Sequence, residues 1–201
     1  DKMEKVTKTQ KWIFFATIFY VILFGFHFYT IGNYEFVWYV LIMFILIALV
    51  SFLQLLFSFS TATLFGISLW GLGHMFGGST LLTDERLYTK VLIPIITTGD
   101  TVVLSYDHVM HFYFYVVATA VIYQIMKQYV KPEVNWLPLS VLILFTSMGV
   151  GAFNEFIEFL PVLFLAETGV GGYFNIAWDI VFNGLGALVT IVYITWKRKN
   201  E

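Results

Sequence analysis

The chain has no cysteine, and only 12% of its 201 residues are charged. Without cysteine, the chain itself cannot form disulfides, thiolate zinc sites or cysteine-ligated iron–sulfur clusters. A soluble globular domain carries about 25% charged residues, so this chain lacks roughly half of the usual polar surface. The net charge of −2 offers no basic stripe of the kind that binds nucleic acid. The sequence therefore predicts a protein whose surface faces lipid.

Apolar and aromatic residues replace the missing charge. Hydrophobic residues make up 59% of the chain and aromatic residues 20%, with 22 Phe, 12 Tyr and 6 Trp. Phenylalanine suits the hydrocarbon interior of a bilayer, whereas tyrosine and tryptophan suit its two interfaces. This composition indicates an integral membrane protein, and it names the lipid bilayer as the first partner of the chain.

Long apolar runs give the number of predicted helices. A spanning helix needs about 20 mainly apolar residues, because the hydrocarbon core is about 30 Å thick. Six segments meet this requirement: 12–32, 36–58, 61–79, 107–130, 137–160 and 173–196. The third is rich in glycine and the least hydrophobic. We predict an all-α, polytopic membrane protein, with residues 1–201 forming a single six-helix membrane domain.

The basic residues predict the orientation, because cytoplasmic loops are enriched in lysine and arginine. Nine of the 11 basic residues would share one side of the membrane: Lys2, Lys5, Lys8, Lys11, Lys127, Lys131, Lys197, Arg198 and Lys199. The other side holds Arg86 and Lys90, in a long outer loop over 80–106. Both termini are therefore expected in the cytoplasm, with the protein in the plasma or inner membrane.

Ionisable residues gather at one predicted depth. Acidic side chains inside a membrane are costly and usually functional. The predicted spans contain four carboxylates and four histidines: Asp107, Glu155, Glu158 and Asp179, and His27, His74, His108 and His111. With both termini inside, all of them fall in the outer half of the bundle. Asp107 and His111 share a helix face, as do Asp179 and Asn183. We predict a polar pocket that opens outward.

The charge of this pocket requires an explanation, because four carboxylates meet no lysine or arginine inside the spans. Three solutions exist: protonated carboxylates, a bound divalent metal ion, or Arg86 and Lys90 folding down from the outer loop. Histidine and carboxylate ligands suit zinc, iron or manganese. The candidate ligands are His74, Asp107, His111, Glu155, Glu158 and Asp179, and the supporting polar residues are His108, Asn154 and Asn183. Glu155 and Glu158 are the candidates for a catalytic base.

Plainer interpretations exist for several of these residues. His27 suits an interfacial position near a helix end. The glycines around His74 would serve close helix packing, with Gly73 and Gly77 at GxxxG spacing. Asp107 and His108 could cap a helix at the water boundary. A hydrogen-bonded structural core is the corresponding alternative for the deeper residues.

Four blocks follow one another along residues 70–190: Gly73-His74-x-x-Gly77-Gly78, Tyr106-Asp107-His108-x-x-His111-Phe112, Asn154-Glu155-x-x-Glu158-Phe159 and Trp178-Asp179-x-x-x-Asn183-x-x-Gly186-Ala187. Together they resemble the uncharacterised bacterial and archaeal inner-membrane family typified by YjdF, and the last three also resemble VanZ-like proteins. Unlike VanZ-like proteins, this chain has His108 in place of a lysine and Glu158 in place of a glutamine, and it lacks an arginine between the last two blocks. The resemblance implies a fold and a site carried by His74, Asp107, His111, Glu155 and Asp179, but no reaction.

Three functions remain open at this point. The pocket could hold a metal that activates water against a lipid headgroup or a related envelope ester. The chain could be an accessory subunit of a larger complex with other membrane subunits. The carboxylates and histidines could also relay protons or ions, although the inner halves of the predicted helices carry no comparable groups.

Overall fold

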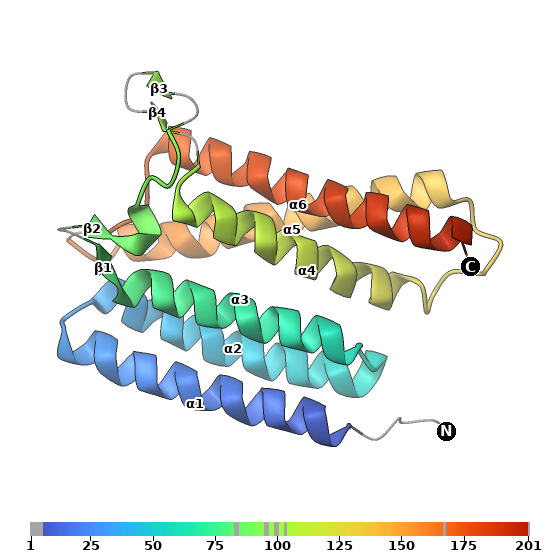
Figure 1. Ribbon diagram of the computed structural model, residues 1–201, viewed down its shortest axis with the longest axis horizontal. Coiled ribbons are helices and arrows are strands. Elements are labelled where there is room, and N and C mark those ends of the chain that lie inside the picture. The colour runs from blue at the N-terminus through green and yellow to red at the C-terminus, as the bar shows by residue number, and fades with distance from the viewer. Residues whose placement is uncertain are drawn as a thin grey trace. The chain divides into compact units, whose positions relative to one another are not determined.

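The computed structural model describes residues 6–82, 85–94, 97–98, 101–102, 104–166 and 168–200. Most of this described part is helical, as the sequence predicts (Figure 1). Its long helices are α1 (Lys8–Thr30), α2 (Tyr34–Phe57), α3 (Thr61–Ser79), α4 (Tyr106–Met126), α5 (Trp136–Val162) and α6 (Tyr173–Asn200). The connection between α3 and α4 contains β1 (Leu81–Leu82), β2 (Glu85–Arg86), the 3-10 turn η1 (Leu87–Thr89), β3 (Thr97–Thr98) and β4 (Thr101–Val102).

Five of the described helices are long and apolar enough to cross a membrane, namely α1, α2, α4, α5 and α6. The remaining long helix, α3, has 19 residues, of which five are glycine. Many large apolar side chains of the long helices are exposed, for example Phe19 at 65% and Phe26 at 72%. An all-α membrane protein accounts for this exposure, because lipid would cover these side chains.

Some helix ends differ from the apolar runs that predicted them: α1 and α6 extend past their runs at one end, whereas α4 ends at Met126 rather than at 130. The helix α1 begins at Lys8 rather than at 12, because Thr7 and Gln10 form a capping box at its start. The helix α6 continues to Asn200 rather than stopping at 196, because lysine and arginine are good helix formers. Charge ends a hydrophobic run without ending a helix.

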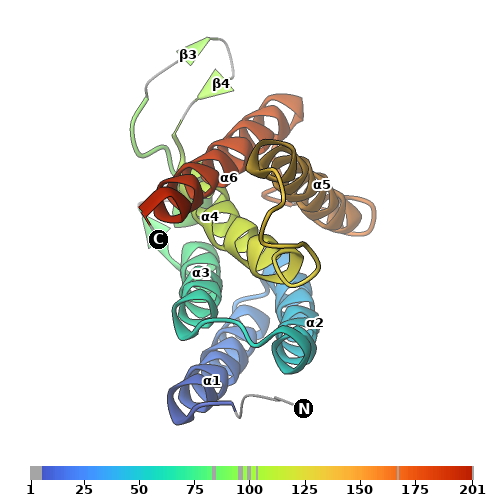
Figure 2. The same ribbon diagram turned by 90° about the vertical axis from the view of Figure 1, so that its right-hand side faces the viewer.

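The chain divides into two compact units, and each is described by itself. Unit 1 contains residues 1–90 and 161–169, and unit 2 contains residues 91–160 and 170–201. The helices α1, α2 and α3 lie side by side in unit 1, and α4, α5 and α6 in unit 2 (Figure 2). The last two residues of α5 belong to unit 1.

Hydrogen bonds and close contacts at glycine residues hold the helices of unit 1 together. The hydroxyl of Tyr20 on α1 donates to the carbonyl of Ser68 on α3 at 2.7 Å. A Cβ atom at Gly71 would collide with Tyr20, and one at Gly78 would collide with Phe36. Close packing on α3 therefore uses Gly71 and Gly78, which are seven residues apart, in addition to any role of the GxxxG pair.

Unit 2 depends on a close approach between α4 and α6. A Cβ atom at Gly186 of α6 would collide with the backbone carbonyl of Phe112 on α4. One turn further along α6, the Thr190 hydroxyl donates to the Val116 carbonyl at 2.9 Å. Glycine at 186 lets the two backbones meet, and this places the polar residues at the start of α6 against the first turns of α4.

The two ends of unit 2 differ in polarity. Where α5 begins, an apolar cluster forms around Leu139, Ile143 and Ile191. Where α4 and α6 begin and α5 ends, the buried residues are instead polar, including Asp107, His111 and Asp179. Unit 2 therefore has an apolar end and a polar end, and the polar end carries the candidate site.

Candidate functional site

The first turns of α4 and α6 and the last turns of α5 supply the cluster. The helix α4 contributes Asp107 and His111, α5 contributes Glu155 and Glu158, and α6 contributes Asp179. Their side chains are between 0% and 15% exposed. Five of the six metal-ligand candidates from the sequence therefore come together in one unit.

The Nε2 atom of His111 lies at the centre of this cluster. It is 3.3 Å from Oδ1 of Asp107, 3.6 Å from Oε1 of Glu158 and 3.9 Å from Oδ1 of Asp179. Three carboxylate oxygens from three helices thus face one ring nitrogen. The side chain of His111 is only 4% exposed, so bulk water does little to separate these groups.

The other ring nitrogen of His111 has a different partner. Nδ1 lies 3.0 Å from Oδ1 of Asn183, and 3.7 Å from Oε1 of Glu155. Because an amide oxygen can only accept, Nδ1 carries the proton and donates it to Asn183. In the neutral ring, this leaves a lone pair on Nε2 that points toward the three carboxylates. That arrangement is repulsive unless a proton or a metal cation lies between them.

Asparagine side chains orient the carboxylates. The amide nitrogen of Asn175 donates to Oδ2 of Asp179 at 2.7 Å and to Oδ2 of Asp107 at 3.3 Å. The Oδ1 atoms of both aspartates are thereby left on the side of His111. Asn154 donates to Oε1 of Glu158 at 2.7 Å. Hydrogen-bonded carboxylates of this kind are typical of metal ligands fixed by a second shell.

His108 lies next to the cluster and contacts one of its carboxylates. Its Nδ1 accepts hydrogen bonds from the backbone N–H groups of Leu104 and Ser105, at 3.1 and 3.2 Å. An atom that accepts two N–H groups carries no proton, so the proton of the neutral ring is on Nε2. Nε2 lies 3.7 Å from Oδ1 of Asp179, and the ring stacks on Phe182. His108 therefore caps α4 and turns an N–H toward Asp179.

The spacing around His111 suits a metal ion. Ligand atoms about 2.1 Å from one tetrahedral metal ion lie about 3.4 Å from one another. The three distances from Nε2, 3.3, 3.6 and 3.9 Å, are close to this value. Asp107, His111 and Asp179 form one group whose ligand atoms all lie within 4.8 Å, and His111, Glu155 and Glu158 form a second.

The charges in the cluster do not balance. Four carboxylates surround one histidine, and their described ion pairs involve only His108 and His111. Arg86 donates to the Gly78 carbonyl at 3.0 Å, and Lys90 pairs with Glu85 at 3.4 Å, in both cases within unit 1. The described contacts of the two outer-loop cations are therefore local ones.

His74 has surroundings of another kind. It belongs to unit 1, where its Nδ1 lies 3.0 Å from the Tyr88 hydroxyl. The rings of Phe36, Tyr39 and Trp70 have centroids within 5.5 Å of its own. Among the described residues, neither group that could hold a metal includes His74. His27 is exposed on α1, and its interfacial position stays a prediction.

Sequence reasoning missed several polar residues near the cluster. Asn175 was one, although its i,i+4 spacing to Asp179 is a usable signal. Tyr115 is fully buried, and its hydroxyl has no hydrogen-bond partner within the described ranges. One turn further along α4, Thr119 donates to Ser147 on α5 at 3.0 Å. Asn175, Tyr115, Thr119 and Ser147 are uncharged at neutral pH, so a search for charged residues and histidines does not find them.

Comparison with known proteins agrees with the membrane interpretation. A family model described as "Predicted membrane protein (DUF2238)" matches residues 10–200. No curated protein and no solved structure matches the chain. The finer likeness to YjdF-type and VanZ-like proteins stays a prediction. Since the match covers nearly the whole chain and several helices are long and apolar, the chain belongs to the DUF2238 family and is a multi-pass membrane protein.

Proposed function

We propose that unit 2 binds one divalent metal ion through Nε2 of His111 and one carboxylate oxygen each from Asp107 and Asp179, the group whose ligand atoms lie within 4.8 Å of one another. Such a set of three ligands leaves a position open for water. The observation that carries this proposal is the lone pair of Nε2 facing three carboxylate oxygens at 3.3 to 3.9 Å. A proton on Nε2 would make one charged pair and leave two carboxylates facing each other. A divalent cation at the same position attracts Nε2 and both aspartate oxygens at once, and it also offsets the nearby charge of Glu158.

Ligand chemistry narrows the choice of metal. One imidazole with two carboxylates is a hard, oxygen-rich ligand set. Carboxylates suit manganese, imidazole also suits iron and zinc, and all three accept a mixed set. We therefore expect manganese or iron in preference to zinc. Asn183 on His111 and Asn175 on the two aspartates would be the second shell that orients the ligands.

The proposal includes a topology. All six long helices cross the membrane, and both termini lie in the cytoplasm. The membrane is the plasma membrane or the inner membrane of the cell. The distribution of lysine and arginine along the chain supports this. Although α3 is not among the five helices that are long and apolar enough to cross a membrane, eight of its residues are buried, so it needs less lipid-facing surface. In this orientation the cluster lies at the outer leaflet.

The chemistry that fits such a site is hydrolysis. A metal ion held by these residues would supply an activated water for such a reaction. Glu155 lies outside the proposed ligand set, 3.7 Å from Nδ1 of His111, and its Oε1 has no hydrogen-bond partner in the described part of unit 2. Glu155 would accept the water proton and return it to the leaving group. Water would add to an ester of a lipid headgroup, and the bond to the leaving alcohol would break as that alcohol takes up the proton.

Metal content tests the proposal directly. Detergent-purified wild type is compared by plasma mass spectrometry with His111→Gln and Asp179→Asn, and with His27→Gln as a matched histidine control on an exposed site. We expect about one metal ion per chain in wild type and the control, and loss in both cluster variants. Thermal melting of each sample shows whether a variant is folded. Metal-free but folded wild type would contradict the proposal and favour an accessory role.

Proton or ion movement receives less support from the same structure. Buried hydroxyls continue from the cluster along α4 to Thr119 and Ser147. Beyond them, Leu139, Ile143 and Ile191 form an apolar cluster at the other end of unit 2. A proton path along these helices would have to cross that cluster. Proton flux in liposomes that stops in Glu155→Gln would nevertheless revive this function.

A further inference from the structure

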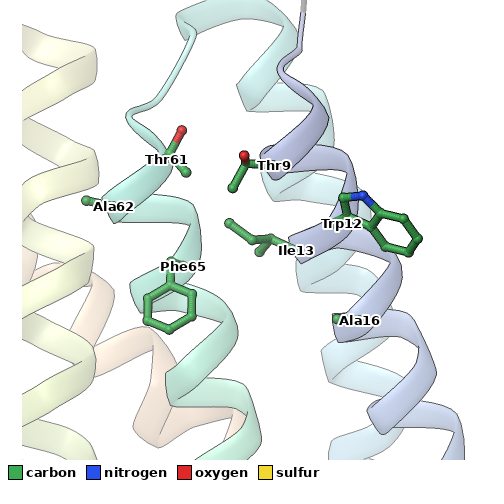
Figure 3. Close-up of a pocket in the computed structure, with 7 residues that line it drawn as sticks. All are labelled: Thr9, Trp12, Ile13, Ala16, Thr61, Ala62 and Phe65. Carbon is green, nitrogen blue, oxygen red and sulfur yellow. The ribbon is translucent and has the colours of Figure 1, made fainter.

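Polar groups without a partner distinguish unit 2 from unit 1. Unit 1 has an open groove between the first turns of α1 and α3, and the side chains that line it are mostly apolar (Figure 3). Among the described residues, none of the buried polar atoms that lack a hydrogen-bond partner belongs to this groove. Unit 2 contains three such atoms outside the proposed metal ligands and His108, on Tyr115, Glu155 and Asn183. The groups that indicate a specific ligand are therefore in unit 2.

These three side chains come together at Gly151 of α5. A Cβ atom at Gly151 would lie 3.1 Å from Nδ2 of Asn183 and 3.6 Å from the Tyr115 hydroxyl. Glu155 is four residues further along α5, and its side chain leans back over the face that carries Gly151. Its Oε1 atom lies 3.7 Å from Nδ1 of His111, the nitrogen that is 3.0 Å from Oδ1 of Asn183. Three helices thus bring three polar groups to one place.

Burial makes these groups costly. The Tyr115 and Asn183 side chains are 0% exposed, and the Glu155 side chain is 10% exposed. In the part of the chain that the structure describes, the Tyr115 hydroxyl, Nδ2 of Asn183 and Oε1 of Glu155 have no hydrogen-bond partner. A buried donor or acceptor that stays unpaired loses the hydration it had in water and gains nothing in return. Three of them side by side point to one ligand that they share.

The three groups also determine the chemistry of this ligand. Nδ2 of Asn183 can only donate, so the ligand must accept a hydrogen bond and is not a cation. An ionised Glu155 can only accept, so the ligand must also donate and is not an anion. The Tyr115 hydroxyl can do either. Water is the smallest molecule that both donates and accepts, and Gly151 places no side chain of its own among the three groups.

We propose that unit 2 binds one ordered water molecule between Tyr115, Glu155 and Asn183. The water accepts hydrogen bonds from Nδ2 of Asn183 and from the Tyr115 hydroxyl, and it donates to Oε1 of Glu155. Three partners are the usual number for a buried water. By binding Nδ2, the water fixes the orientation of the Asn183 amide, whose Oδ1 accepts from His111. The water site includes no proposed metal ligand and does not depend on the metal.

Thermal unfolding of the detergent-purified protein tests the water site. Tyr115→Phe removes one partner of the water, and Gly151→Ala places a methyl group among the three polar groups. The matched controls are Tyr193→Phe, at a residue that is 58% exposed, and Gly149→Ala, where a Cβ atom meets nothing within 4 Å. A crystal structure of wild type, at a resolution that shows ordered water, locates the molecule directly. Metal content is measured in each sample, so that the two proposals are judged separately.

We expect Tyr115→Phe to melt about 2–4 °C below wild type, the shift for one lost hydrogen bond in a chain of this size. Gly151→Ala should melt below Gly149→Ala. The double variant should lose less than the sum of the single losses, because both changes disturb the same water. Wild type that contains this water but no metal would contradict the proposed function and support the water site.

The opposite sign would overturn the proposal. Removal of a buried hydroxyl that has no partner at all relieves an unpaired group, so Tyr115→Phe would then melt above wild type. Equal melting temperatures of Gly151→Ala and Gly149→Ala would also contradict the water site. A crystal structure in which Tyr115 donates directly to Glu155, with no water between them, would do the same.

Discussion

The Nδ1 atom of His111 and the Oδ1 atom of Asn183 lie 3.0 Å apart, although 72 residues separate them in the chain. This hydrogen bond fixes which ring nitrogen keeps a lone pair. It also joins α4 to α6 beside the close approach at Gly186. The proposed metal site therefore depends on an amide that binds no metal itself.

We predict that Asn183→Leu binds metal 10- to 100-fold more weakly than wild type, because loss of a second-shell partner has about this effect. Asn183→Asp should keep most of the affinity, since a carboxylate also accepts the Nδ1 proton. Competition with a fluorescent chelator measures both values. Asn200→Leu, at the exposed end of α6, is the control. Equal affinity in wild type and a folded Asn183→Leu protein would show that Asn183 does not orient the ligand.

His108 should matter for stability more than for metal binding. His108→Leu removes the acceptor for the N–H groups of Leu104 and Ser105, so we expect a loss of about 1–3 kcal/mol in the free energy of unfolding. His108→Gln can still accept at the start of the helix, as in a capping box, and should lose less. Thermal unfolding in detergent at fixed metal concentration separates the two variants. Melting temperatures equal to that of wild type in both variants would show that His108 does not stabilise the start of α4.

Gly186→Ala should disrupt unit 2, because the new methyl group would collide with the Phe112 carbonyl. A carbonyl of a helix backbone cannot turn aside, so α4 and α6 must separate. We expect a lower melting temperature and loss of bound metal together. Gly149→Ala on α5 is the matched control, since a Cβ atom there meets nothing within 4 Å. It should be neutral or slightly stabilising, because alanine favours helices by about 1 kcal/mol over glycine. Similar behaviour of both variants would argue against a tight contact at Gly186.

His74 provides a contrasting prediction. Its ring lies among aromatic side chains in unit 1 and next to the Tyr88 hydroxyl. We expect His74→Phe to keep its full metal content, while weakening the attachment of the segment that carries Tyr88. Elemental analysis tests the first part, and limited proteolysis of the 80–90 segment tests the second. Metal loss in a folded His74→Phe protein would return His74 to the ligand set.

Sequence patterns predict the helices well, because each long apolar run must satisfy its own backbone hydrogen bonds in lipid. Sequence patterns also predict which residues lie at the same depth in the membrane, but residues at the same depth need not be neighbours. His74 and His111 would occupy a similar depth, yet their described neighbours are aromatic rings in one case and carboxylates in the other. Depth follows from counting residues, whereas neighbours depend on how helices rotate and pack.

Asn175 is a second residue whose neighbours could not be predicted from the sequence. It is an uncharged residue in the first turn of a helix, where asparagine is common for local reasons. Its importance appears only when α4 and α6 meet and one amide reaches both Asp107 and Asp179. The spacing of Asn175 and Asp179 could have indicated one of these contacts. The other contact joins residues 68 positions apart.

The proposed ligands lie on α4 and α6, with Glu158 of α5 beside them. Metal binding at this place would tie the cohesion of unit 2 to the supply of metal. An ion that binds only the folded arrangement stabilises it by about 2.7 kcal/mol at a free concentration 100 times its dissociation constant. Chains inserted into the membrane during metal starvation would then hold α4 and α6 together less firmly and would be degraded sooner. The cellular amount of this protein should rise and fall with metal availability, even when its synthesis is constant.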